Sequence, residues 1–161
     1  MNEKENLKLE THCIIKKVLD GDSIIVQNIF TKEEKEIRLN GIDAPELKKC
    51  SKLLQDERET HLAGQLLMKL GRLSLNYLLT ITKHEMPCTI AIEQSNSTDV
   101  YGRTLAYVYL ADGSCLNEKM IAEGFAKPFN KYYCGQLINY QKINIFARQG
   151  KKGLYRVVKN F

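Results

Sequence analysis

The sequence lacks any apolar run approaching the roughly 18 residues that a membrane-spanning helix needs. It also lacks C-x-x-C spacing among its five cysteines, so neither a zinc site nor a redox motif is indicated. We expect buried free thiols, as in a reducing compartment, and one disulfide stays open as an alternative. The histidines have no metal-ligand spacing either, and we interpret them as ordinary structural or surface residues: His12, His61 and His84.

The N-terminal segment Met1 to Glu10 is polar and has no apolar core of a signal peptide. This favours a cytoplasmic protein, although a secreted protein trimmed of its signal would show the same sequence. We expect residues 1–10 to be a flexible lead-in and residues 11–161 to be one domain. The chain is long enough for one core, and it contains no repeat or linker.

The charge balance is mildly basic, with 24 Lys and Arg against 19 Asp and Glu, a net charge of +5 and a pI near 8.9. Such an excess suits a polyanionic partner, but many proteins with this balance bind none. Charge alone therefore does not assign a function.

Short apolar and β-branched runs predict about five strands. The first three are joined by short polar turns, which favours an antiparallel meander. The other two follow a helix, and Asp112-Gly113 marks a hairpin turn after the last of them. The expected strands are residues 12–19, 23–29, 35–40, 88–93 and 104–110.

Three helices are expected. Apolar residues from Leu62 to Tyr77 recur at helical spacing and form one stripe that should pack on the sheet. Residues 116–123 and 136–148 form two more, each followed by a glycine that can end a helix. The charged residues 47–58 are interpreted as a solvated loop. The pattern by itself supports an α+β fold with an antiparallel sheet.

Three short motifs bring acids and arginines together in turns and at strand ends. They are Asp20-Gly21-Asp22, the segment from Arg38 to Glu46, and the segment from Asp99 to Arg103. Carboxylates can hold a hard metal ion, and guanidinium groups can grip a phosphate in fork geometry. Phosphodiester hydrolysis needs that combination.

Each motif is weak alone. Asp20 and Asp22 stand two residues apart and would share a face of an extended chain, but Asp-Gly-Asp is also a common turn. Arg38 alternates with Ile37 and Leu39, so it should point away from a core that holds those two. The three motifs in one order make coincidence an inadequate explanation.

The order, spacing and neighbours of these motifs resemble the staphylococcal-nuclease-like family, also called thermonucleases, from about Lys16 to about Lys127. The resemblance implies an OB-fold: a five-stranded Greek-key barrel with a mainly β core, accompanied here by the three helices. That fold commonly binds oligonucleotides across one face.

The resemblance also implies a calcium site. Asp22 and Asp43 match the family's direct calcium ligands, and the backbone carbonyl of Ala44 matches a third. Asp20 matches a residue near the metal that acts through water.

The catalytic roles implied by the resemblance fall on three residues. Arg38 and Arg103 match the phosphate-binding pair, and Glu46 matches the family's candidate general base. Calcium and the arginines would stabilise the charge on the phosphate, while Glu46 would orient or deprotonate a water.

Tyr101 matches a tyrosine that lines the nucleotide pocket in the family. The family's two further pocket tyrosines have no match in spacing here, so Tyr132 and Tyr133 are both candidates. Lys48 and Lys49 are further candidates for substrate binding, with the solvated loop as the alternative.

These matches imply a calcium-dependent nuclease that cuts DNA and RNA and leaves 3′-phosphate ends. Single strands should be favoured, because a narrow pocket must reach the backbone and an unstacked base. We expect a monomer without a membrane partner. The alternative is a non-catalytic OB-fold module that binds nucleic acid, but such modules usually lose these acids and arginines, and here all are present.

Overall fold

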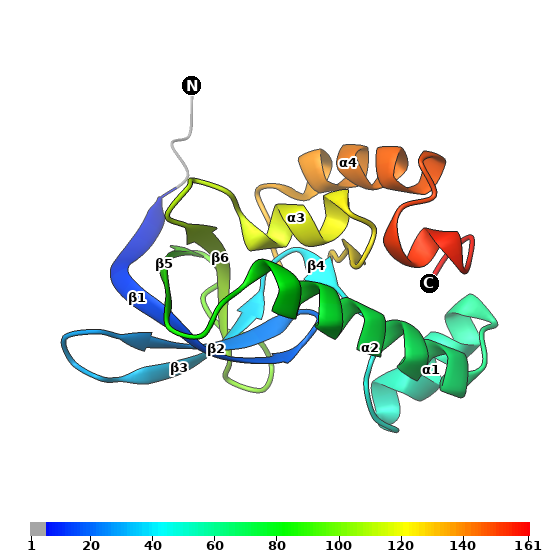
Figure 1. Ribbon diagram of the computed structural model, residues 1–161, viewed down its shortest axis with the longest axis horizontal. Helices are drawn as coiled ribbons and strands as arrows, with labels where there is room; N and C mark the ends of the chain where they lie inside the picture. The colour runs from blue at the N-terminus through cyan, green and yellow to red at the C-terminus, as the bar shows by residue number, and fades with distance from the viewer. Residues whose placement is uncertain (1–5) are drawn as a thin grey trace.

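A closed five-stranded barrel forms one end of the molecule, and helices extend from it (Figure 1). The computed structural model describes residues 6–161, with the strands in the order β1-β2-β3-β6-β5 around the barrel. A separate short pair, β4 with β7, is antiparallel. The strands are β1 Leu7–Asp20, β2 Ser23–Asn28, β3 Glu34–Leu39, β4 Ile42–Asp43, β5 Met86–Glu93, β6 Thr104–Leu110 and β7 Lys127–Pro128.

The long strand β1 closes the barrel because it pairs with both β2 and β5. Its pairing with β5 shifts register between Glu10 and Cys13, where His12 adopts a positive φ of 59°. Such irregularities bend a strand, and bending is what allows a sheet to close on itself. The parallel pairing of β3 with β6 completes the ring.

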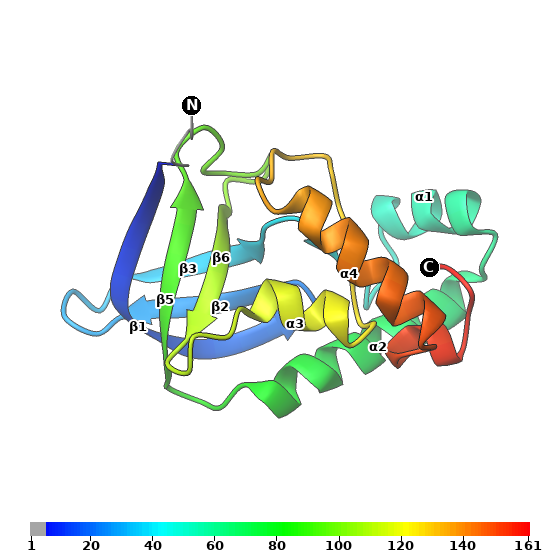
Figure 2. The same ribbon diagram turned by 90° about the horizontal axis from the view of Figure 1, so that it is seen from above.

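The helices lie outside the barrel. α2 packs against β1 and also contacts α1, while α3 packs against β6 and α4. Figure 2 shows the strands gathered at one end and α1 and the C-terminal segment at the other. The helices are α1 Ser51–Thr60, α2 Gly64–Ile81, α3 Leu116–Ala122, α4 Leu137–Gln149 and the 3-10 helix η1 Gly153–Arg156.

The barrel interior is the main apolar core, and Ile24, Ile37, Leu39 and Ile90 are fully buried there. A second apolar cluster joins α1, α2, α4 and the C-terminal segment. Among residues 6–161, no helix is both long and apolar enough to span a bilayer. All five cysteines are free, and four of them are buried: Cys13, Cys88, Cys115 and Cys134.

The predicted α+β class with a five-stranded barrel is confirmed, and two details are corrected. Residues 6–161 contain four α-helices instead of the expected three, because residues 51–60 of the expected solvated loop form α1. This run contains no glycine or proline and is rich in good helix formers. The expected lead-in over residues 1–10 also differs, because residues 7–10 belong to β1, and residues 1–5 lie outside the described part.

Two glycines let α2 approach the turns that carry acids. A Cβ at Gly21 would lie 2.7 Å from the Cβ atoms of both Ala44 and Ser74. A Cβ at Gly71 would lie 2.5 Å from the carbonyl oxygen of Pro45 and 2.7 Å from that of Glu46. These contacts hold the backbone on each side of the acids against one helix.

Replacing Gly71 with alanine should destabilise the protein despite the better helix propensity of alanine. The added methyl group must displace backbone atoms of Pro45 and Glu46, and overpacking of this kind costs about 1–3 kcal/mol. Urea denaturation would measure the loss, with Asn76→Ala on the exposed face of α2 as the control. Equal stability of the two variants would contradict the close contact.

Candidate active site

The acids and one arginine of the three motifs come together beside the barrel. Asp22 lies in the turn between β1 and β2, Arg38 lies near the end of β3, and Asp43 lies in β4. All three are buried, with 7%, 6% and 3% of their surface exposed. The neighbours of Arg38 on the strand, Ile37 and Leu39, face the core as predicted. Arg38 is nevertheless enclosed, because the β4 segment covers it.

Arg38 joins the two acids. Its Nη1 lies 3.2 Å from Asp22 Oδ2, and its Nη2 lies 3.3 Å from Asp43 Oδ1. Nη1 also donates to the carbonyl oxygen of Ile42 at 3.0 Å. The guanidinium carbon lies 5.5 Å from the centre of the Phe129 ring, within reach of a cation–π contact. One buried cation therefore fixes the geometry between the β1–β2 turn and β4.

Asp22 makes a second link between these segments. Its Oδ2 accepts a hydrogen bond from the backbone N–H of Ala44 at 2.9 Å. Asp20 is used differently, since its Oδ1 accepts from the backbone N–H of Asp22 at 3.0 Å and from Ser23 Oγ at 2.8 Å. Asp20 thus stabilises the turn that presents Asp22.

Burial sets the protonation behaviour of the site. It raises the pKa of Asp22 to about 7, with Arg38 opposing the rise and Asp20 adding to it. Burial is also the main cause that raises the pKa of Glu46, and the negative charge of Asp22 raises it further. Burial acts against the charge on Arg38, yet Asp22 and Asp43 raise its pKa, so it stays protonated. The positive charge of Arg38 therefore does not fully offset the burial of Asp22.

Helix α1 contributes a second cation. Lys52 Nζ lies 2.9 Å from Asp43 Oδ2, 2.8 Å from Asp56 Oδ2 and 4.0 Å from Glu46 Oε1. Lys52 and Asp56 were missed by sequence reasoning because this segment was interpreted as a loop. Their i,i+4 spacing in an uninterrupted charged run is the signal that could have found them.

Arg103 directly precedes β6, the strand that pairs with β3, which carries Arg38. In the parallel pairing of β3 with β6, Arg38 stands opposite Leu105, which places Arg103 near Glu36. Its Nε donates to Asp99 Oδ2 at 2.7 Å, and its Nη1 lies 3.8 Å from Glu36 Oε1. Asp99 Oδ1 also accepts from the backbone N–H of Arg103, so the loop holds the guanidinium group in one orientation.

The tyrosines occupy different positions. Tyr101 is 81% exposed, and the Arg103 guanidinium carbon lies 5.7 Å from the centre of its ring. The hydroxyl of Tyr132 accepts a hydrogen bond from the backbone N–H of Val100, so Tyr132 lies beside the same loop. Tyr133 has an exposed side chain, and its carbonyl oxygen accepts from the Asn40 amide at 3.1 Å. Tyr132 is thus tied directly to the loop that carries Tyr101 and Arg103.

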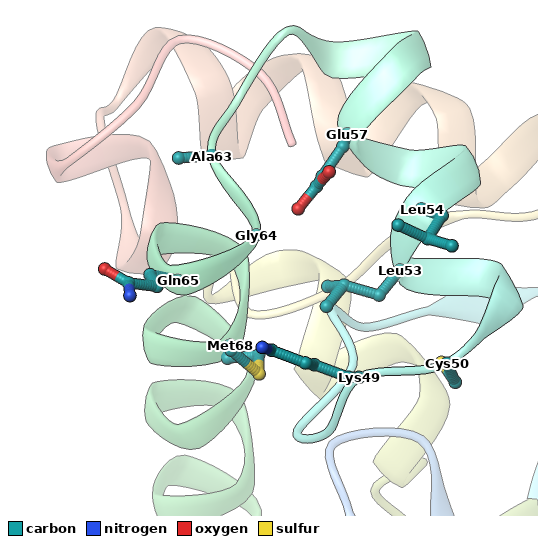
Figure 3. A pocket seen from close by; sticks show the side chains of 9 residues that line it. All are labelled: Lys49, Cys50, Leu53, Leu54, Glu57, Ala63, Gly64, Gln65 and Met68. Atoms are coloured by element: carbon teal, nitrogen blue, oxygen red, sulfur yellow. The ribbon is translucent and has the colours of Figure 1, made fainter.

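Lys48 and Lys49 are exposed and precede α1. Lys49 borders a cavity of about 530 Å³ between α1 and the start of α2, and Figure 3 shows its side chain reaching toward Met68. The rest of the lining is largely apolar, with Leu53 and Leu54 from α1. Neither Asp22, Asp43 nor Glu46 lines this cavity.

The donor set suits a hard cation. Asp22 and Asp43 offer carboxylate oxygens, and the carbonyl of Ala44 follows Asp43 directly. Within residues 6–161, no group of three or more His, Cys, Asp or Glu side chains is placed to enclose a metal. An ion held here would therefore depend on two carboxylates, a backbone carbonyl and solvent or substrate oxygens, which is compatible with flexible calcium coordination.

A five-stranded barrel with buried acids and an arginine at its edge defines a class of site that could bind a phosphodiester. The family model described as "Staphylococcal nuclease homologue" matches residues 36–156. The chain therefore belongs to the staphylococcal nuclease homologue family. The match includes Arg38, Asp43, Glu46 and Arg103, whereas Asp22 precedes it and is connected to the site by its contacts with Arg38 and Ala44.

Individual proteins that are similar to this chain are also named as nucleases. A thermonuclease of Staphylococcus intermedius is 31% identical over 121 residues, covering 74% of this chain and 60% of the relative. Endonuclease YhcR of Bacillus subtilis is 27% identical over 143 residues, covering 89% of this chain but 11% of the relative. A thermonuclease of Staphylococcus hyicus is 29% identical, covering 91% of this chain and 75% of the relative. The chain thus spans less than two thirds of the first two relatives.

Removing the charge of Arg38 should destabilise the fold strongly. Arg38→Met keeps much of the side-chain length but leaves Asp22 and Asp43 buried without their shared cation. Breaking a buried ion pair on one side costs about 3–5 kcal/mol. Urea denaturation at neutral pH is the measurement. Lys16→Met is the control, because its ion pair with Glu85 is more exposed and should contribute less than about 1 kcal/mol. Similar losses in both variants would contradict the assigned importance of Arg38.

Proposed function

We propose that this protein is a calcium-dependent nuclease that hydrolyses phosphodiester bonds of DNA and RNA. The observation that carries the proposal is the arrangement of Arg38 between Asp22 and Asp43, with Glu46 next to them. Membership of the nuclease family and the relatives' names support a nuclease. Calcium use, substrate range and product ends are the finer parts of the proposal.

Asp22, Asp43 and the carbonyl of Ala44 would hold the ion, with Asp20 supporting it from the turn. When bound, calcium supplies positive charge that polarises the scissile phosphate. The raised pKa of Asp22 supports this assignment, because burial has left its carboxylate without full compensation by Arg38. A cation there would favour the ionised form.

Arg38 and Arg103 would bind phosphate oxygens. Both guanidinium groups are already oriented by carboxylates, Arg38 by Asp22 and Asp43, and Arg103 by Asp99. Donors that are fixed before substrate arrives require little reorganisation when charge develops on the phosphate. Their planar forks match phosphate geometry better than a lysine would.

Glu46 would orient or deprotonate the attacking water. Its side chain is 31% exposed, so water can reach it, while burial and the charge of Asp22 raise its pKa. A carboxylate with a raised pKa is a stronger base than a free one. Attack opposite the 5′-oxygen would leave a 3′-phosphate end.

The substrate would be held mainly through its backbone. Tyr101 presents an exposed ring next to Arg103 that could stack on an unpaired base, and Tyr132 lies beside the same loop. Base stacking tolerates any sequence, so single strands of both DNA and RNA fit this surface. Tyr133, Lys48 and Lys49 remain candidates for contacts farther along the strand.

A non-catalytic module that binds nucleic acid is the competing function. Binding requires positive charge and stacking surfaces, but it does not require Glu46 or a pair of buried acids. The buried acids carry an energetic cost that a binding module has no need to bear. An activity assay separates the two functions.

Cutting of single-stranded DNA should depend on calcium. We expect cleavage with calcium, loss of cleavage with excess chelator, and recovery when calcium is restored, monitored on denaturing gels with mapping of the product ends. Cleavage that persists in chelator would contradict the calcium mechanism. Binding without cleavage in calcium would favour the non-catalytic module.

Glu46→Gln should lower turnover by about 10²-fold or more, the scale of general base catalysis. Substrate affinity should change far less, because Glu46 would act mainly in the chemical step. Single-turnover kinetics and binding measured separately would resolve the two effects. A Glu57→Gln variant is a matched control for the loss of one carboxylate, because Glu57 lines the cavity between α1 and α2. Full activity of Glu46→Gln would remove Glu46 from the mechanism.

A further inference from the structure

Helix α1 inserts Lys52 among the acids of the site. The Lys52 ammonium group contacts Asp43 Oδ2 at 2.9 Å and approaches Glu46 Oε1 to 4.0 Å. Asp43 Oδ1 faces Arg38, so each oxygen of this carboxylate has its own cation. Lys52 is therefore positioned to affect both a metal ligand and the water-activating acid.

Asp56 anchors Lys52 from one turn further along α1. Its Oδ2 lies 2.8 Å from Lys52 Nζ, and Asp56 is 8% exposed. The Lys52 side chain is 32% exposed, so its ammonium group lies at the border between the acids and solvent. A flexible surface lysine would lose considerable side-chain entropy here, and the three carboxylates offset that loss.

We propose that Lys52 is a positioning residue that holds Asp43 and Glu46 in their working orientations and weakens the intrinsic affinity of the site for calcium. The proposal rests on the proposed function. Asp56 fixes the ammonium group and prevents it from moving further into the space that the acids offer to a cation.

Removal of the Lys52 charge should change calcium affinity and the rate of the chemical step in opposite directions. A fixed ammonium group repels a divalent cation that shares the Asp43 carboxylate, so its removal should strengthen calcium binding. The same ammonium group orients Glu46 by attraction, so its removal should slow the chemical step. A residue that only supported the fold would weaken calcium binding and turnover together.

Lys52→Met is the decisive variant because it keeps the length of the side chain and removes the charge. We expect calcium to bind roughly tenfold more tightly, as measured by titration calorimetry without substrate. Turnover on single-stranded DNA at saturating calcium should fall roughly tenfold or more, with a smaller change in KM. Circular dichroism and thermal melting would establish that the variant is folded.

Three companion variants separate charge from position. Lys52→Arg keeps the charge and should bring calcium affinity close to that of the unmodified protein, with partial turnover. Asp56→Asn keeps Lys52 but removes its anchor, so turnover should fall while calcium binding does not tighten. Lys142→Met on the exposed surface of α4 is the control for loss of one positive charge elsewhere, and it should change neither quantity.

These experiments test the role of Lys52 and the proposed nuclease function separately. Weaker or unchanged calcium binding in folded Lys52→Met, or full turnover, would overturn the role of Lys52 and leave the nuclease proposal standing. An unmodified protein that neither binds calcium nor cuts nucleic acid would overturn the proposed function itself. Tighter calcium binding with reduced turnover supports the role of Lys52.

Discussion

The buried ion pairs of Arg38 with Asp22 and Asp43 are the interaction on which the site depends. Burying a charge carries a large desolvation penalty, which is offset only where oppositely charged partners are held at the right positions. Here the barrel sets these positions, because β3 carries Arg38 while the β1–β2 turn and β4 carry the acids. The fold thus fixes where the charged groups lie, and the ion pairs connect β3, the β1–β2 turn and β4.

Helix α2 extends this constraint to the surrounding backbone. Gly21 and Gly71 allow it to pack directly against the turns on both sides of the acids. A third glycine, Gly41, has a φ of 79° and turns the chain from β3 into β4. Ser74 on α2 donates to the carbonyl oxygen of Phe125, so α2 is also bound to the segment leading to β7. Small residues at these positions therefore help to place Asp43 and Glu46.

The sequence predicted the barrel strands well, because alternation of apolar residues is a local property of each strand. Through the resemblance carried by three motifs, it also pointed to Asp22, Arg38 and Asp43, which the structure brings into contact. It did not predict α1, because a charged helix without an apolar stripe has the same composition as a solvated loop. Lys52 contacts Asp43 across a tertiary interface, and no local pattern encodes that contact.

The choice between Tyr132 and Tyr133 could not be made from the sequence for a similar reason. Their loop is held by distant residues: Glu93 Oε1 accepts from the backbone N–H of Gly135 and from the hydroxyl of Tyr107. The side chain of Asn40 holds the carbonyl of Tyr133. The backbone of this loop is thus positioned by contacts between residues 42 and 93 positions apart along the chain.

A crystal structure with calcium and a nucleoside 3′,5′-bisphosphate would test the central claim most directly. The account predicts that the ion is bound by the carboxylates of Asp22 and Asp43, and that Arg38 and Arg103 donate to the same phosphate group. A structure in which the ion binds elsewhere, or in which Arg38 makes no contact with the phosphate, would contradict it.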